Sequence, residues 1–138
     1  MGKTDSRTLS VYKNKPFARF ASKANIADAD LWKAAWLANQ GMIDADLGGG
    51  VIKLRIARSG QGKSGGSRSI VLFKKDNRAV YVYGFEKKDI SNIGLKDLDA
   101  FRKLAKAYLG YTGAEMAQRV EDGVLLIVQE PEGKDNAK

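Results

Sequence analysis

The sequence contains no cysteine and no histidine among its 138 residues. The absence of cysteine excludes disulfides, thiol nucleophiles and cysteine metal sites. The absence of histidine excludes the commonest general base and the Ser-His and Cys-His nucleophile systems, and it leaves only carboxylates to bind a transition metal. Any acid–base chemistry must therefore use lysine, aspartate, glutamate or tyrosine, and we expect neither a metal nor a cofactor.

Long apolar segments are also missing. No run approaches the roughly 20 residues needed to span a bilayer, and the first six residues lead into no apolar segment of the kind found in secretory signals. We therefore expect a cytoplasmic protein without a membrane partner. The length favours a single core, with a flexible N-terminus over 1–6, one domain over 7–129 and a flexible polar tail over 130–138.

Positive charge is in excess. Lysine and arginine number 24 against 16 acidic residues, for a formal net charge of +8. Most of this excess lies between residues 51 and 78, where one acid, Asp76, accompanies eight basic residues: Lys53, Arg55, Arg58, Lys63, Arg68, Lys74, Lys75 and Arg78. Such clustering favours a polyanionic partner such as nucleic acid.

The expected elements follow the order of an α+β protein. Alternating or apolar runs predict strands over 8–12, 51–56, 69–73, 79–85 and 124–128. Helical spacing of apolar residues predicts helices over 16–24, 28–40, 95–110 and 113–121. Pro16 should begin the first helix and Asp28 should cap the second, while Thr112 and Glu115 have the spacing of a capping box. We expect the helices to cover one face of the sheet and to leave the other partly open.

Three cations should meet on one sheet surface. In the strand over 51–56, alternation directs Lys53 and Arg55 to the face opposite the apolar residues, and Arg68 opens the neighbouring strand. Tyr81 and Tyr83 have the parity to share a face and to stack on unpaired bases. The alternative is that these tyrosines belong to the core and that the cations form a solvated face.

Such a surface has a chemistry that needs no histidine. Strand scission through the ribose 2′-hydroxyl requires a base, stabilisation of the phosphorane and protonation of the leaving 5′-oxygen. Clustered lysine and arginine stabilise the negative charge directly. Because neighbouring like charges favour a neutral lysine, Lys53 is the candidate base.

Two other motifs resemble functional sites. Residues 57–64 end in Gly-Lys-Ser like a P-loop, but Ala57 replaces the first glycine and a β-type segment follows where a helix is needed. We therefore expect no nucleotide hydrolysis there, although the amides of this loop and Lys63 can still hold nucleic-acid phosphates. Asp44 and Asp46 precede three glycines. Although paired carboxylates can bind a metal or act as a base, aspartates beside glycine more often make turn hydrogen bonds.

Three stretches of the sequence resemble the RelE/HigB-like toxins of bacterial type II toxin–antitoxin systems: 44–55, the Gly-Gln-Gly-Lys-Ser-Gly-Gly-x-Arg run over 60–68, and 83–87. The similarity extends from about residue 11 to 128. It implies an α+β, RelE-like fold in which a curved antiparallel sheet is covered on one face by an N-terminal helical hairpin and C-terminal helices. It also implies a ribosome-dependent endoribonuclease that cleaves mRNA in the A site and inhibits translation.

The resemblance also implies site residues and partners. It assigns catalysis to four residues: Lys53 as base or phosphate clamp, Arg55 and Arg68 as stabilisers of the transition state, and Lys87 at the substrate or leaving group. The expected RNA-binding residues are Arg58, Lys63, Tyr81, Tyr83 and Lys88. Lys88 takes the role of Lys87 if the correspondence with the family motif is shifted by one residue. Ser67 departs from the pattern, because this branch usually has an aromatic residue there. A cognate antitoxin, commonly a helix-turn-helix protein, would provide the toxin's contact with operator DNA.

Two alternative functions remain at this stage. One is a non-catalytic toxin of the same superfamily, similar to the ParE-like inhibitors of gyrase. The other is a basic module that binds nucleic acid without cleaving it.

Overall fold

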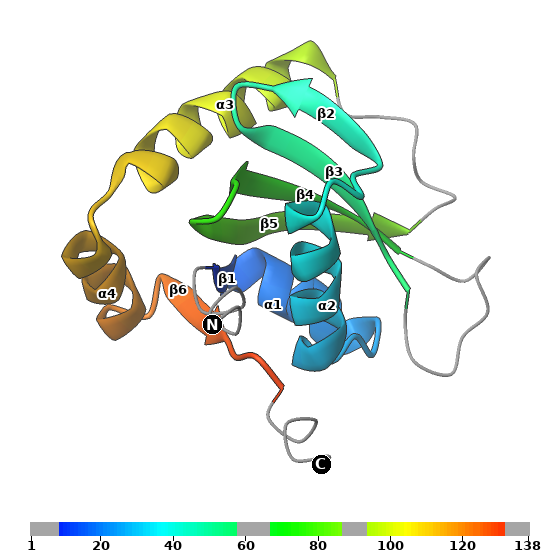
Figure 1. Cartoon of the computed structure of the whole chain (residues 1–138), viewed down its shortest axis with the longest axis horizontal. Coiled ribbons are helices and arrows are strands. Elements are labelled where there is room, and N and C mark those ends of the chain that lie inside the picture. Colours follow the sequence, from blue (N-terminus) through cyan, green and yellow to red (C-terminus); the bar gives the residue numbers. More distant parts are fainter. Residues whose placement is uncertain (1–8, 58–66, 87–93, 132–138) are drawn as a thin grey trace.

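A six-stranded mixed sheet with four helices forms the structure (Figure 1). This computed structural model describes residues 9–57, 67–86 and 94–131. The expected segment 1–6 and residues 132–138 of the expected tail lie outside this part. The strands are β1 (Ser10–Asn14), β2 (Ala45–Gly48), β3 (Val51–Ile56), β4 (Ser67–Lys74), β5 (Arg78–Glu86) and β6 (Leu125–Val128). The helices are α1 (Lys15–Lys23), α2 (Asp28–Asn39), α3 (Leu95–Gly110) and α4 (Gly113–Glu121).

The sheet has the strand order β2-β3-β4-β5-β1-β6. All neighbours are antiparallel except β1 and β5, which are parallel. The expectation of an antiparallel sheet was therefore wrong for this pair. Parallel neighbours need a long connection, and the chain between β1 and β5 supplies it with two helices and three strands.

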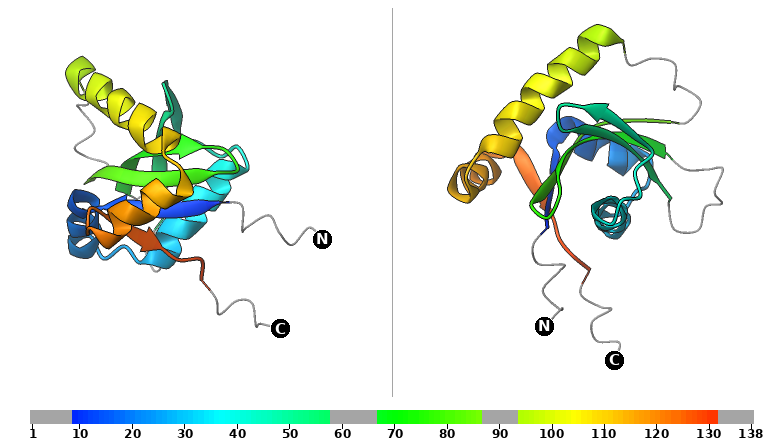
Figure 2. Two further views of the ribbon diagram at one scale, coloured as in Figure 1. Left: turned by 90° about the vertical axis from the view of Figure 1, so that its left-hand side faces the viewer. Right: turned by 45° about the horizontal axis from the view of Figure 1, so that its top comes forward.

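Helices pack on both faces of the sheet, which corrects the expectation that they cover one face and leave the other partly open. Alternate residues of β4 point to opposite faces: Val71 belongs to the apolar cluster with α1 and α2, whereas Ile70 and Leu72 belong to the cluster with α3 and α4. Figure 2 shows α2 and α3 on opposite sides of the sheet. The unbroken apolar run of β4 is typical of a strand buried on both faces.

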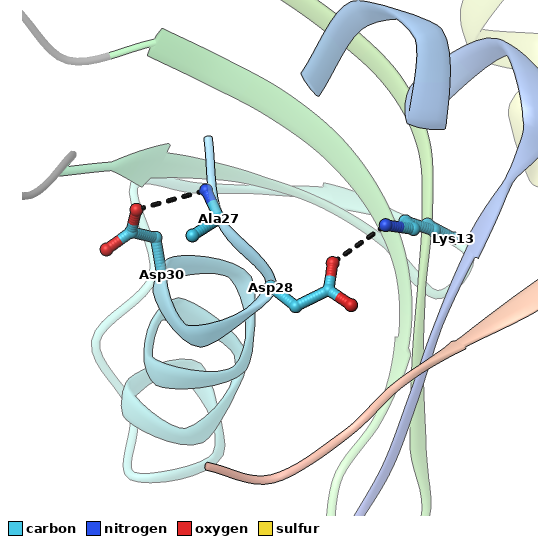
Figure 3. Close-up of polar contacts among 4 residues, drawn as sticks. All are labelled: Lys13, Ala27, Asp28 and Asp30. Carbon is cyan, nitrogen blue, oxygen red and sulfur yellow. Dashed lines mark hydrogen bonds and ion pairs between the residues drawn. The ribbon is translucent and has the colours of Figure 1, made fainter. Parts of the chain in front are cut away.

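The first two helices begin with different capping groups. The side chain of Asn14 accepts a hydrogen bond from the backbone N–H of Phe17 at 2.9 Å and so caps α1. Asp28 was expected to cap α2, but Ala27 holds the cap position, and its N–H donates to the Asp30 carboxylate at 3.3 Å. Asp28 instead pairs with the Lys13 ammonium at 2.7 Å (Figure 3), which ties the start of α2 to β1.

A two-residue glycine turn joins β2 to β3 and is in contact with α3. Gly49 and Gly50 have φ values of +65° and +86°, as a tight hairpin of primed type requires. The Arg102 guanidinium of α3 donates to the carbonyls of Leu47 and Gly48. A Cβ on Gly49 would lie 2.9 Å from Arg102 Cγ, so glycine allows α3 to sit directly on this turn.

The last two helices bring the chain back to the sheet edge. The predicted capping box at the start of α4 is confirmed by reciprocal hydrogen bonds between Thr112 and Glu115, at 2.8 and 3.1 Å. Among the described residues, no helix has the length and apolar character needed to cross a membrane.

Candidate functional site

Basic residues meet where β3 ends and β4 begins. Arg55 and Arg68 lie directly opposite each other in the β3–β4 register, and Lys53 is opposite Ile70, two residues along the same strands. The side chains of Lys53 and Arg68 are 25% and 14% exposed. They are thus sheltered by the fold but open to a ligand.

A carboxylate links two of these cations. The Oδ2 atom of Asp44 lies 3.8 Å from Lys53 Nζ and 3.5 Å from Arg68 Nε. Arg68 Nη1 is buried, and among the described residues it has no hydrogen-bond partner. Arg55 is exposed and also lines an open groove of about 780 Å³ along α2, together with Trp36 and Ala57.

The two aspartates before the glycine turn have different roles. Asp46 accepts a hydrogen bond from the N–H of Gly48 at 2.9 Å, so the prediction of a turn aspartate is confirmed at that position. Asp44 was wrongly assigned to the same role, because its carboxylate reaches the basic site instead. Sequence spacing gave no signal for this contact, which depends on β2, an element predicted as loop.

The position of Asp44 also bears on the choice of base. Lys53 was favoured as a base because its expected neighbours were all cations. A carboxylate lies beside it in the structure, so neighbouring cations alone no longer favour a base over a phosphate clamp.

An aromatic surface adjoins the cations. Tyr83 is opposite Ile70 in the β4–β5 register and therefore lies in the same cross-strand row as Lys53. Its side chain is 46% exposed, and its ring contacts those of Phe85 and Phe101 with centroids 5.9 Å apart in each pair. Tyr83 thus presents a supported ring beside the basic residues, as base stacking requires.

Tyr81 lies on the opposite face from Tyr83, so the prediction of a shared face was wrong. The register shifts between Ile70 and Val71, and this irregularity leaves one extra residue, Val82, on β5. Tyr81 is fully buried among residues that pack with α1 and α2, and its hydroxyl donates to the carbonyl of Leu31 at 2.7 Å. Burial raises the pKa of this hydroxyl far above its ordinary value. Tyr81 is a core residue and is not available to RNA.

Ser67 also points away from the basic residues. Successive side chains alternate along β4, and Ser67 is fully buried next to Arg68, with its hydroxyl 3.3 Å from a carboxylate oxygen of Glu86. An aromatic residue at this position would start on the face opposite Arg68. The departure at Ser67 therefore removes no ring from the surface that carries Tyr83.

Several expected site residues lie outside the described part of the chain: Arg58, Lys63, Lys87 and Lys88. The Gly-Lys-Ser end of the P-loop-like segment lies there too. Within 9–57, 67–86 and 94–131, no group of three or more acidic side chains is arranged to hold a metal ion.

The fold and the site together define a small α+β protein whose sheet carries a basic surface beside an exposed aromatic ring. Comparison with protein families identifies it further. The model described as RelE toxin of RelE / RelB toxin-antitoxin system matches residues 9–128, and the chain belongs to this family. Toxins of the family are generally endoribonucleases, and membership implies an antitoxin partner and action on the ribosome. No curated protein matches the chain.

Proposed function

We propose that this protein is a HigB-like toxin that cleaves mRNA in the ribosomal A site and thereby stops translation in the cytoplasm. The observation that carries the proposal is the meeting of Lys53 and Arg68, from two adjacent strands, beside the exposed ring of Tyr83. The RNA phosphate would lie between the two cations, and a neighbouring base would stack on the tyrosine.

The proposed reaction is attack by a ribose 2′-oxygen on the adjacent phosphorus. A base takes the 2′-hydroxyl proton, the bond from phosphorus to the 5′-oxygen breaks, and the products are a 2′,3′-cyclic phosphate and a new 5′-hydroxyl. Negative charge grows on the phosphorane, where fixed cations are most effective in a sheltered site. Arg68 suits this role because its guanidinium is largely buried and retains an unpartnered Nη1 among the described atoms.

The remaining roles follow the family resemblance. Arg55 would assist Arg68, Lys53 would act as base or phosphate clamp, and Lys87 would contact the substrate or the leaving group. Arg58, Lys63 and Lys88 would hold the RNA backbone. No metal or histidine enters this scheme, because lysine and arginine supply both the charge and the protons.

The proposed partners are ribosome-bound mRNA and a cognate helix-turn-helix antitoxin. The antitoxin would neutralise the toxin and carry its only contact with operator DNA.

Mapping of mRNA 5′ ends after induction in cells tests this proposal against its alternatives. We expect discrete new ends inside codons for the parent, and loss of these ends together with relief of growth arrest for Lys53→Ala and Arg68→Ala. DNA damage without new ends would instead identify a ParE-like inhibitor of gyrase. RNA binding with a steep salt dependence, but no cleavage even with ribosomes, would identify a binding module. If both variants folded and stayed as toxic as the parent, the site itself would be wrong.

A further inference from the structure

An acidic side chain lies at the centre of the cationic site. Asp44 Oδ2 is 3.8 Å from Lys53 Nζ and 3.5 Å from Arg68 Nε. Because like charges repel, a carboxylate in this place opposes the entry of a phosphate. Its presence in a site for polyanions therefore needs an explanation of its own.

The backbone of Asp44 is fixed while its side chain is partly free to turn. The Asp44 N–H donates to the carbonyl of Lys53 at 3.0 Å, which holds the main chain against β3. The side chain is 35% exposed and precedes the short edge strand β2. The carboxylate can thus rotate toward solvent without any change in the sheet.

The two contacts of Asp44 are looser than a structural ion pair of the same chain. Lys13 and Asp28 lie 2.7 Å apart and share a hydrogen bond, which is the usual spacing of a charge-assisted pair. Both contacts of Asp44 are longer than this. The carboxylate is attracted by two cations at once and is held tightly by neither.

The cations need a counter-charge when RNA is absent. Lys53 and Arg68 come from adjacent strands, two residues apart in the β3–β4 register, and both approach the same point. Like charges that converge in this way repel each other. A shared carboxylate offsets this repulsion and keeps Lys53 and Arg68 directed toward one point.

We propose that Asp44 is an internal counter-ion that occupies, in the RNA-free protein, the place between Lys53 and Arg68 that a phosphate takes on binding. When the phosphate arrives, the carboxylate rotates away, and the two cations exchange one anion for another. Asp44 is thus a positioning residue that acts through Lys53 and Arg68. The identification of this phosphate as part of an RNA rests on the proposed function.

The test compares Asp44→Asn, which keeps the shape and removes the charge, with Asp46→Asn two residues away as a matched control. The probe is a short RNA with 2′-O-methyl riboses, which binds but cannot be cleaved. We expect Asp44→Asn to bind it more tightly than the parent, about threefold or more at low salt, and with a log–log salt slope steeper by about 0.7, the value for one further phosphate contact on a single strand. Asp46→Asn should bind like the parent.

The melting temperature of the RNA-free protein gives a second readout. Asp44→Asn should melt below the parent at low salt and approach it as inorganic phosphate is added, because the added anion replaces the missing carboxylate. A merely structural aspartate would lower the melting temperature without strengthening the binding of RNA.

Two results would overturn this assignment. One is binding by folded Asp44→Asn that is equal to or weaker than that of the parent. The other is a large loss of cleavage on ribosomes with unchanged binding, which would make Asp44 a base. The proposed function fails separately if the parent cleaves no mRNA on ribosomes. In that case the affinity of Asp44→Asn for the uncleavable RNA, relative to that of the parent, still decides the role of Asp44. If the parent bound no RNA, the phosphate-dependent melting temperature would decide it.

Discussion

Removal of the Tyr81 hydroxyl tests the register shift that separates the two tyrosines of β5. Tyr81 is fully buried, and its hydroxyl donates to the Leu31 carbonyl at 2.7 Å. Tyr81→Phe keeps the ring and removes the hydroxyl that donates to this carbonyl. Loss of one buried hydrogen bond costs about 0.5–1.5 kcal/mol of stability at pH 7.

The pH dependence of this deficit gives a sharper signature. Burial raises the pKa of Tyr81 in the folded protein, whereas an unfolded tyrosine ionises near pH ~10. The folded state therefore holds its proton where the unfolded state has lost it, so the parent loses stability above about pH 10, approaching ~1.4 kcal/mol per pH unit. Phenylalanine cannot ionise, so the variant keeps its stability in this range. The difference in unfolding free energy between the parent and Tyr81→Phe should therefore shrink above pH 10 and nearly vanish around pH ~11, where the parent has lost about 1.4 kcal/mol.

Urea unfolding of the parent, Tyr81→Phe and Tyr83→Phe between pH 7 and 11 measures this effect. Tyr83 is 46% exposed, and loss of an exposed hydroxyl should change stability by no more than about 0.5 kcal/mol. Equal stability losses in the two variants, with the same dependence on pH, would show that the two tyrosines have been assigned to the wrong faces.

Three further predictions follow from single contacts. Tyr83→Ala should weaken binding of the uncleavable RNA by about 1–3 kcal/mol, the value of one stacked base, whereas Tyr83→Phe should keep the affinity; equal fluorescence anisotropy titrations for the two variants would contradict a stacking role. Arg78→Met should lower the free energy of unfolding by about 3 kcal/mol, because the buried guanidinium donates to two carbonyls near the end of α3 at 2.7 and 2.8 Å; unchanged urea unfolding would refute this. Gly84→Ala should cost about 1–3 kcal/mol in the same assay, since a Cβ would lie 2.2 Å from the Phe20 ring. Gly110→Ala, a helical glycine whose Cβ would meet nothing within 4 Å, should instead stabilise by up to about 1 kcal/mol.

The basic strand was predictable because its pattern is local. Alternation along β3 assigned Lys53 and Arg55 to one set of positions and Ile52, Leu54 and Ile56 to the other, and the three apolar residues do lie in the core. The same reasoning failed on β5, because the bulge there reverses which residues point to each face of the sheet, and the residue types in this strand do not predict a bulge. Tyr81 was therefore placed on the wrong face.

The contacts that sequence reasoning missed are those that depend on pairing between distant segments. β2 ends in Gly48 and is followed by two more glycines, so its sequence predicts a loop, and it becomes a strand by pairing with β3. Asp44 reaches Arg68 only because β2 adds to this edge. The unbroken apolar run of β4, by contrast, did contain the information that both faces of the sheet are buried.

Single-turnover cleavage of mRNA on purified ribosomes tests the central claim most directly. The variants are Lys53→Gln, Arg68→Gln and the control Lys74→Gln, which removes an exposed positive charge from the opposite end of β4. We expect Arg68→Gln to slow cleavage by about 10²–10³-fold, as loss of one donor to a developing oxyanion does, and Lys53→Gln to slow it at least tenfold, while Lys74→Gln cleaves like the parent. Equal loss in all three variants would show that only the net charge matters, and parental rates for folded Lys53→Gln and Arg68→Gln would contradict the assignment of this site.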